Sequence, residues 1–103
     1  MADFMKILQQ AQEMQGRFQK LQEELQQQTV KASSAGGMVT VEANGQGTVK
    51  SIKIDPSIVN ASDVEMLEDL VLVAVTEAQK KAQESAQAEM GKLTGGLPFK
   101  LPF

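Results

Sequence analysis

The sequence predicts an α+β domain in which two long helices flank a small antiparallel sheet. Apolar residues recur every three or four positions in residues 3–28 and every second position in much of residues 29–55, and a Pro at position 56 precedes a second helical stretch. The first spacing places side chains on one stripe of a helix, and the second places them on one face of a strand. The 103 residues are expected to form one domain over residues 1–93, followed by a flexible Gly/Pro/Phe tail over residues 94–103.

The first helix is predicted over residues 3–28. Asp3 is a suitable N-cap, because its carboxylate can accept hydrogen bonds from free amides of the first turn. Gly16 costs up to about 1 kcal/mol relative to Ala, but one Gly does not end so regular a pattern. The nine Gln residues of this segment are interpreted as a neutral solvated face, the alternative being contacts to phosphates or bases. A heptad seam of three repeats consists of Phe4, Ile7, Ala11, Met14, Phe18, Leu21 and Leu25.

Three strands are predicted in the middle of the chain. The first, over residues 29–34, is weak, and the Ala-Gly-Gly stretch at residues 35–37 permits a turn because Gly tolerates positive φ angles. In the second strand, Val39, Val41 and Ala43 alternate with polar residues, which is typical of a half-buried strand.

The second and third strands are predicted to form a hairpin. Asn44-Gly45 favours a type I′ turn, in which both central residues take positive φ angles. Residues 48–54 supply the return strand, but Val49 lies on the opposite parity from the two Ile residues that follow it. Either a bulge near Gly47 shifts the register, or both faces of this strand are partly covered.

The second helix is predicted from a capping box at Ser62 and Glu65 to about Met90. Residues 55–57, Asp-Pro-Ser, end the sheet before it, because Pro cannot donate a hydrogen bond to a neighbouring strand. Gly91 and the following Thr-Gly-Gly should stop the helix. Its main apolar stripe consists of Val64, Leu67, Val71, Ala74, Ala78 and Ala82.

Residues 70–75 are apolar around the whole helix and therefore need cover on more than one side. A domain of this size has few layers to supply that cover, and a second subunit is the simplest source. A homodimer is therefore predicted, with an interface that contains Leu70, Val71, Val73 and Ala74.

Two Phe residues in the tail, Phe99 and Phe103, could dock on a partner. A frayed terminus is the simpler interpretation, because the tail has no hydrogen-bonding pattern.

Composition argues against several classes of function. The sequence has no Cys and no His, so it lacks thiolate chemistry, the usual general base and the usual metal ligand. Paired acids such as Glu68 and Asp69 point in different directions on a helix, and the Gly turns lack the context of a P-loop. We expect no enzyme, no cofactor, no metal site and no small-molecule substrate. No apolar run approaches the ~20 residues of a membrane span and no signal-peptide pattern opens the chain, which predicts a cytoplasmic location and no membrane partner.

The distribution of charge limits where a nucleic acid could bind. The net charge is −3, whereas the surface of a nucleic-acid-binding domain is usually basic. Residues 56–90 contain two bases and seven acids, and four of these acids lie between Asp63 and Asp69, where the first ones complement the helix dipole. Any surface for DNA must therefore lie away from the start of the second helix.

Several short motifs follow one another in a specific order along the chain. They are the Gln- and Met-bearing first helix, Gly36-Gly37 with Val39-x-Val41, Asn44-Gly45-x-Gly47, Ile52-x-Ile54-Asp55-Pro56-Ser57, Glu65-Met66-Leu67-Glu68-Asp69-Leu70 and Lys92-Leu93-Thr94-Gly95-Gly96. Together they resemble the YbaB/EbfC family of small nucleoid-associated proteins of bacteria. The resemblance implies a three-stranded antiparallel sheet flanked by two long helices, and a homodimer whose helices project like tweezers. It also implies binding of duplex DNA with low sequence specificity, a location at the nucleoid, and an effect on nucleoid organisation and gene expression.

Binding of duplex DNA requires cations that face phosphates. If the two helices are antiparallel, the start of the first should approach the end of the second, which would group Lys6 with the lysines of the second helix. The predicted DNA-binding residues are Lys6, Arg17, Lys20, Lys80, Lys81 and Lys92. For any one of them a solvated helix face is the alternative; Glu13 and Arg17, for example, form a favourable i, i+4 pair.

The alternative function is a helix–hairpin–helix adaptor or chaperone-like scaffold that binds other proteins through the heptad seam or the Phe tail. The response to salt separates the two, because phosphate binding weakens steeply with salt and apolar recognition does not.

Overall fold

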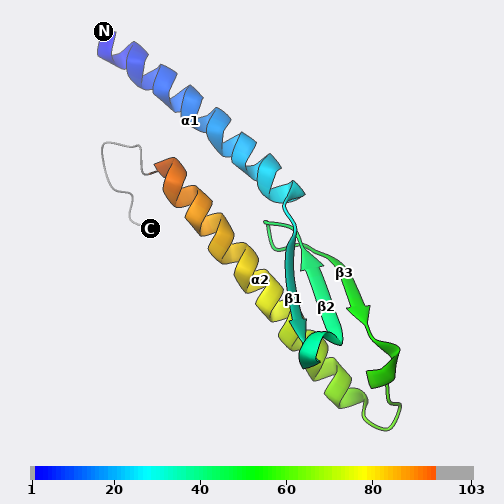
Figure 1. The fold of residues 1–103 in the computed structure, drawn as a ribbon. Helices are drawn as coiled ribbons and strands as arrows, with labels where there is room; N and C mark the ends of the chain where they lie inside the picture. Colours follow the sequence, from blue (N-terminus) through cyan, green and yellow to red (C-terminus); the bar gives the residue numbers. More distant parts are fainter. Residues whose placement is uncertain (1, 95–103) are drawn as a thin grey trace.

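The computed structural model describes residues 2–94 and has the predicted α+β architecture (Figure 1). Two long helices, α1 (Ala2–Gln27) and α2 (Val64–Thr94), run antiparallel, and a three-stranded sheet lies against the first part of α2. The strands are β1 (Val30–Ser34), β2 (Val39–Ala43) and β3 (Val49–Ile54), and short 3-10 helices occupy Ala35–Gly37 and Pro56–Ile58. The molecule is a rod of 73 × 23 × 17 Å. Apart from Thr94, the predicted tail lies outside the described residues.

Neither α1 nor α2, within the described residues, combines the length and apolar character needed to span a membrane.

The sheet is antiparallel and has the strand order β1-β2-β3. Val39 and Val41 of β2 lie opposite Ile54 and Ile52 of β3, so these four side chains share one face. Near the end of β2 the register shifts by one residue, which returns Val49 to the same face. Of the two explanations for the broken alternation in this strand, the bulge is therefore confirmed.

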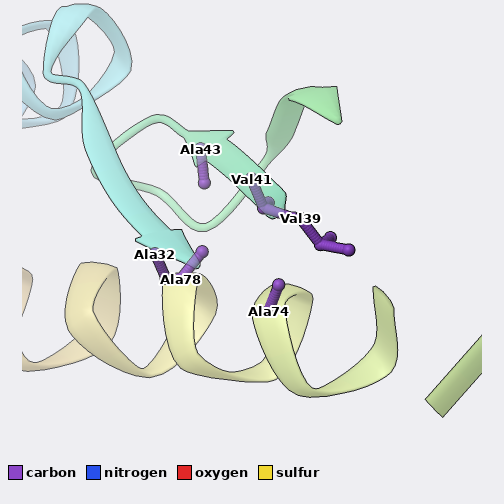
Figure 2. Close-up of a cluster of buried hydrophobic side chains, with 6 residues drawn as sticks. All are labelled: Ala32, Val39, Val41, Ala43, Ala74 and Ala78. Atoms are coloured by element: carbon purple, nitrogen blue, oxygen red, sulfur yellow. The ribbon is translucent and has the colours of Figure 1, made fainter. Parts of the chain in front are cut away.

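The core lies between α2 and the face of β1 and β2 that the helix covers (Figure 2). It is built from small residues, which are Ala32, Val39, Val41, Ala43, Ala74 and Ala78. Ala74, Ala78 and Ala82 are 0% exposed, which confirms the central part of the predicted stripe on α2. Val64, also predicted in that stripe, is 52% exposed, because α2 begins beyond the ends of β1 and β2 (Figure 1).

The loop between β2 and β3 is not the predicted type I′ turn. Its positive φ angle is at Gly47 (87°), and neither Asn44 nor Gly45 has one. The side-chain oxygen of Asn44 instead accepts from two backbone N–H groups further along the loop, at 2.9 and 3.0 Å. The N–H of Gly45 donates to the carbonyl oxygen of Leu25 in α1, at 2.7 Å. Gly45 is therefore required by the close approach of α1 and not by the backbone angles of the turn.

The cap of α2 lies one residue later than predicted. The Asp63 carboxylate accepts from the backbone N–H of Met66 at 3.2 Å, so Asp63 is the N-cap and the predicted box of Ser62 and Glu65 is wrong. The N–H of Ser62 donates to the side chain of Asn60 at 2.9 Å, which holds Ser62 in the preceding turn. Asp and Ser are similarly good caps, so this local turn decides between them.

The other end of α2 lies at Thr94, beyond the predicted end near Met90. Gly91 continues the helix, although a Gly in this position costs about 1 kcal/mol relative to Ala. The half-buried Leu93 lines a cleft together with Leu21 of α1, and this packing favours a longer helix.

The heptad seam of α1 is only partly covered. Leu21 and Leu25 are buried and Phe18 is half-buried, whereas Phe4 and Ile7 are both 61% exposed. The cause is the offset between the two helices along the rod: α1 continues toward its N-terminus past the end of α2 (Figure 1). The seam thus predicts the helix correctly, and half of it has no partner within the described part of the chain.

Candidate nucleic-acid interface

Three cationic side chains line a cleft between α1 and the end of α2, which we call the basic cleft. It has a volume of about 300 Å³ and is lined by Arg17, Lys20, Leu21, Glu24, Glu89, Lys92 and Leu93. The apolar residues come from both helices, and the charged side chains stand around them. Lys92 forms an ion pair with Glu89 (N–O distance 3.4 Å) in which the lysine side chain remains 75% exposed. Three of the six predicted DNA-binding residues therefore meet here, together with two acids.

Two further predicted lysines lie on the same flanks of the helices as the basic cleft. Lys6 precedes Arg17 by eleven residues, and Lys81 precedes Lys92 by eleven residues. Eleven residues make about three turns at 3.6 residues per turn, so each pair shares one side of its helix, about 16 Å apart. Lys81 also donates to the backbone carbonyl of Lys31 in β1, at 3.0 Å.

The expected grouping of Lys6 with the lysines of α2 is wrong. The residues of α1 that lie beside Lys92 are Arg17 and Lys20, because α1 extends beyond the end of α2. Lys80 is adjacent to Lys81 in sequence and is therefore turned by about 100° around the helix axis, away from the basic cleft.

The acids at the start of α2 lie far from the basic cleft. Asp63 is about 44 Å from Lys92 along the helix, at 1.5 Å per residue. Within residues 2–94, no group of three or more acidic side chains lies close enough together to hold a metal ion. The long axis of the rod thus separates the acidic start of α2 from the cations of α1 and the end of α2.

Asp55 makes a local hydrogen bond at the point where β3 ends. Its carboxylate accepts from the backbone N–H of Ser57 at 2.8 Å, and this hydrogen bond lowers the pKa of Asp55 below its usual 3.8. Asp55 is exposed at the end of β3 and caps the short helix Pro56–Ile58. Asp55 therefore stabilises the turn that ends the sheet.

A second cleft is lined by residues of α1, the β2–β3 loop and α2, and hydrogen bonds at this cleft join the loop to both helices. The side-chain amide of Gln46 donates to the backbone and side-chain oxygens of Gln22 in α1, at 3.3 and 3.1 Å. Gln79 of α2 donates to the carbonyl of Gly47 at 3.1 Å. The sequence indicated a solvated face for Gln22, or contacts to phosphates or bases, and gave no role to Gln46 or Gln79. The spacing of Gln22 from Leu21 and Leu25 could have placed it at the edge of the seam.

An apolar groove separates β3 from α2. It has a volume of about 430 Å³ and is lined by Ile54, Leu67, Glu68, Val71, Leu72 and Val75. On the sheet face that α2 covers over β1 and β2, Ile52 (45%) and Ile54 (37%) of β3 remain exposed. Leu72 is 63% exposed at the edge of the groove.

The four residues predicted for a dimer interface occupy different surroundings. Val71 lines the apolar groove, whereas Ala74 is 0% exposed and belongs to the core of a single chain. Leu70 is half-buried, and its carbonyl accepts from the Ser34 hydroxyl of β1 at 2.7 Å. Val73 is 51% exposed and, one residue from Leu72, points about 100° away from it around α2.

Comparisons with known proteins agree with these features. Residues 1–97 match the model of the YbaB/EbfC DNA-binding family. A nucleoid-associated protein of Gemmatimonas aurantiaca is 54% identical over 103 residues, which cover 98% of this chain and 99% of that protein. A nucleoid-associated protein of Thermodesulfovibrio yellowstonii is 58% identical over 99 residues, 96% of this chain and 85% of that protein. The crystal structure of an uncharacterized protein from Helicobacter pylori has a TM-score of 0.80 at 25% identity, covering 89% of this chain and 97% of that one.

These matches name no catalytic activity, and they agree with the motif order, the antiparallel sheet and the paired helices described above. The chain therefore belongs to the YbaB/EbfC family of nucleoid-associated, DNA-binding proteins.

Proposed function

We propose that this protein binds duplex DNA as a homodimer, through contacts from Lys and Arg side chains to phosphates and with low sequence specificity. The observation that carries the proposal is the meeting of Arg17, Lys20 and Lys92 at the basic cleft. Lys6 and Lys81 extend the same flank of the molecule in both directions. DNA at this surface would place the protein in the cytoplasmic nucleoid.

The chemistry of the basic cleft favours phosphates over base edges. Its cations are on long, exposed side chains beside Glu24 and Glu89, so the surface is mixed in charge and not a shaped donor array. Contacts of this kind position a protein on the duplex and carry no direct sequence information. Binding should therefore be weak in each subunit and strongly dependent on salt.

The apolar groove supports the homodimer. Its exposed Ile, Leu and Val side chains would be covered most simply by the same groove of a second copy, since a two-fold interface pairs one patch with itself. Ile54 lines the groove, and Ile52 lies two residues before it on the same face of β3, which α2 leaves exposed at this strand. This placement retains Val71 from the predicted interface, adds Leu72, and leaves Val73 outside.

Two adjacent lysines give a matched test of the DNA surface. Lys81→Glu should weaken binding to any duplex and flatten its salt dependence, because Lys81 shares the flank of Lys92. Lys80→Glu makes the same change in charge one residue away and should have a smaller effect. Fluorescence anisotropy with labelled duplexes, between about 50 and 200 mM salt, measures both variants, with circular dichroism as a check on folding.

For the unmodified dimer, neutralising about four to six phosphates predicts a log–log salt slope of roughly −4 to −5. Equal losses of DNA affinity for the two lysine variants would contradict the assignment of Lys81, and not Lys80, to the DNA-binding side of α2. Binding that barely responds to salt would contradict phosphate contact altogether, and the protein-binding adaptor would then replace the proposal.

A further inference from the structure

Six cationic side chains lie in three groups along one side of the rod, which we call the basic edge. The middle group is that of the basic cleft, with Arg17, Lys20 and Lys92. One outer group is Lys6, on the same flank of α1. The other outer group consists of Lys81 and of Lys31 in β1, which was not among the predicted DNA-binding residues.

Lys31 joins the basic edge through Lys81. The Lys81 ammonium donates to the backbone carbonyl of Lys31 at 3.0 Å, which holds α2 beside β1, an edge strand of the sheet. The Lys31 ammonium forms an ion pair with Glu42 (N–O distance 3.3 Å), but the lysine side chain stays 66% exposed. An ion pair so open to water contributes little, so Lys31 remains available to a phosphate.

The two outer groups are separated by about one turn of a DNA duplex. Lys6 is about 16 Å from Arg17 and about 21 Å from Lys20 along α1, at 1.5 Å per residue. Lys81 is about 16 Å from Lys92 along α2. Because the middle group lines a single cleft, the outer groups are roughly 33–38 Å apart. One turn of B-form DNA is about 34–36 Å long.

The residues between the groups also agree with this spacing. A line along one side of a duplex meets a sugar–phosphate backbone at each end of a full turn and once between them, with a groove in each interval. Glu13 follows Lys6 by seven residues and Ala88 follows Lys81 by seven residues, so each shares the flank of its lysine and lies in one interval. Neither side chain can bind a phosphate, and a groove places none there.

We propose that a duplex lies along the basic edge, parallel to the long axis of the rod, and that Lys31 contacts a phosphate at one end of a footprint of one helical turn. This inference rests on the proposed function, because it takes duplex DNA as the ligand. DNA is straight over this length, since its persistence length is about 150 base pairs. A duplex that crossed the rod could not meet both Lys6 and Lys31, because they are farther apart than a duplex is wide. The acids of α2 stay clear of the footprint, since Asp69 lies about 18 Å beyond Lys81.

Removal of single charges tests this alignment. Lys6→Gln and Lys31→Gln should each weaken binding to a duplex of about 20 base pairs, or two turns, by roughly five- to tenfold near 0.1 M salt. Each should also flatten the log–log salt slope by about 0.9 for every subunit in contact. The matched control is Lys53→Gln, which removes a charge from the same outer face of the sheet but on β3, at the other edge, and should change neither quantity by as much. Fluorescence anisotropy measures the four proteins, with circular dichroism as a check on folding.

The outcomes separate this inference from the proposed function. Binding by the unmodified protein that barely responds to salt would contradict both. Salt-dependent binding that weakens in Lys92→Gln, but is unchanged in Lys6→Gln or in Lys31→Gln, would refute the alignment and leave the proposed function standing. Equal losses in Lys31→Gln and Lys53→Gln would remove Lys31 as a contact, because the loss would then follow the net charge and not the position.

Flow linear dichroism provides a second measurement that needs neither a variant nor a fixed position on the DNA. In flow-oriented DNA the bases absorb across the duplex axis, whereas an α-helix has a far-ultraviolet band that absorbs along its own axis. With α1 and α2, of 26 and 31 residues, parallel to the duplex, this band should have the sign opposite to that of the bases once the spectrum of free DNA is subtracted. The same sign as the bases, or no signal from bound protein, would overturn the alignment.

Discussion

Replacing Gly45 with Ala should destabilise the fold by loosening α1 from the β2–β3 loop. A Cβ atom at this position would lie 2.6 Å from the side-chain oxygen of Gln28, 2.8 Å from the carbonyl oxygen of Leu25 and 2.9 Å from a methyl of Leu25. The Gln28 side chain can move, but the carbonyl cannot move alone, because it accepts the 2.7 Å hydrogen bond from the Gly45 N–H. The substitution must therefore shift α1 or break that bond.

The cost can be assembled from two parts. Overpacking of a tight contact costs about 1–3 kcal/mol, and the loss of a hydrogen bond costs about 1 kcal/mol. Gly45 does not have a positive φ angle, so backbone strain adds nothing. We expect a loss of roughly 2–4 kcal/mol in the free energy of unfolding, which urea titration followed by circular dichroism at one fixed protein concentration would measure.

Two other glycines serve as controls because a Cβ at either meets nothing within 4 Å. Gly47 has a φ of 87°, so Gly47→Ala should lose about 1–2 kcal/mol through backbone strain alone. Gly16 lies in α1, where Gly16→Ala should gain about 0.5–1 kcal/mol. An unchanged stability for Gly45→Ala, or a loss smaller than that of Gly47→Ala, would refute the close-approach explanation.

Three further predictions concern polar groups. Asn44→Ala should cost about 1–3 kcal/mol in urea titrations, because the 3% exposed side chain accepts from two loop amides that would lose their partner. Asp55→Ala should lower stability at neutral pH. Since the folded pKa of Asp55 lies below 3.8, this difference is present above pH 3.8 and should vanish as the pH falls through the lowered pKa; a difference that persists in stronger acid would contradict the hydrogen bond to Ser57 as its cause. Glu68→Gln with Asp69→Asn should leave DNA affinity unchanged or slightly higher in the anisotropy assay. A clear loss of affinity with the fold intact would show that DNA contacts the start of α2, contrary to the proposal.

The dimer surface is tested by a third matched comparison. Leu72→Glu should lower the mass measured by light scattering to that of a monomer, because it puts a charge into the apolar groove. Val73→Glu points about 100° away around α2 and should leave the mass unchanged. The opposite pattern would restore the interface predicted from the sequence.

The sequence by itself determined the order and type of the elements. The heptad spacing from Phe4 to Leu25, the alternation at Val39 and Val41, and the stop at Pro56 all depend on residues close together in the chain. Such local signals predict the elements correctly, because helix and strand periodicity depends on neighbours within a few positions. The family could be recognised for the same reason, since its motifs are short and ordered.

Tertiary structure decided which of these residues meet. Whether Gly45 serves a turn or a close contact depends on Leu25, twenty residues away, and whether Ser62 or Asp63 caps α2 depends on the turn made by Asn60. The residues of α1 that join Lys92 depend on how far the two helices overlap, which no spacing within either helix contains. Burial and proximity arise from packing between distant segments. The seam of α1 therefore predicted the helix but not which half of the seam is covered. That depends on where α2 ends, beside Arg17 and Leu21.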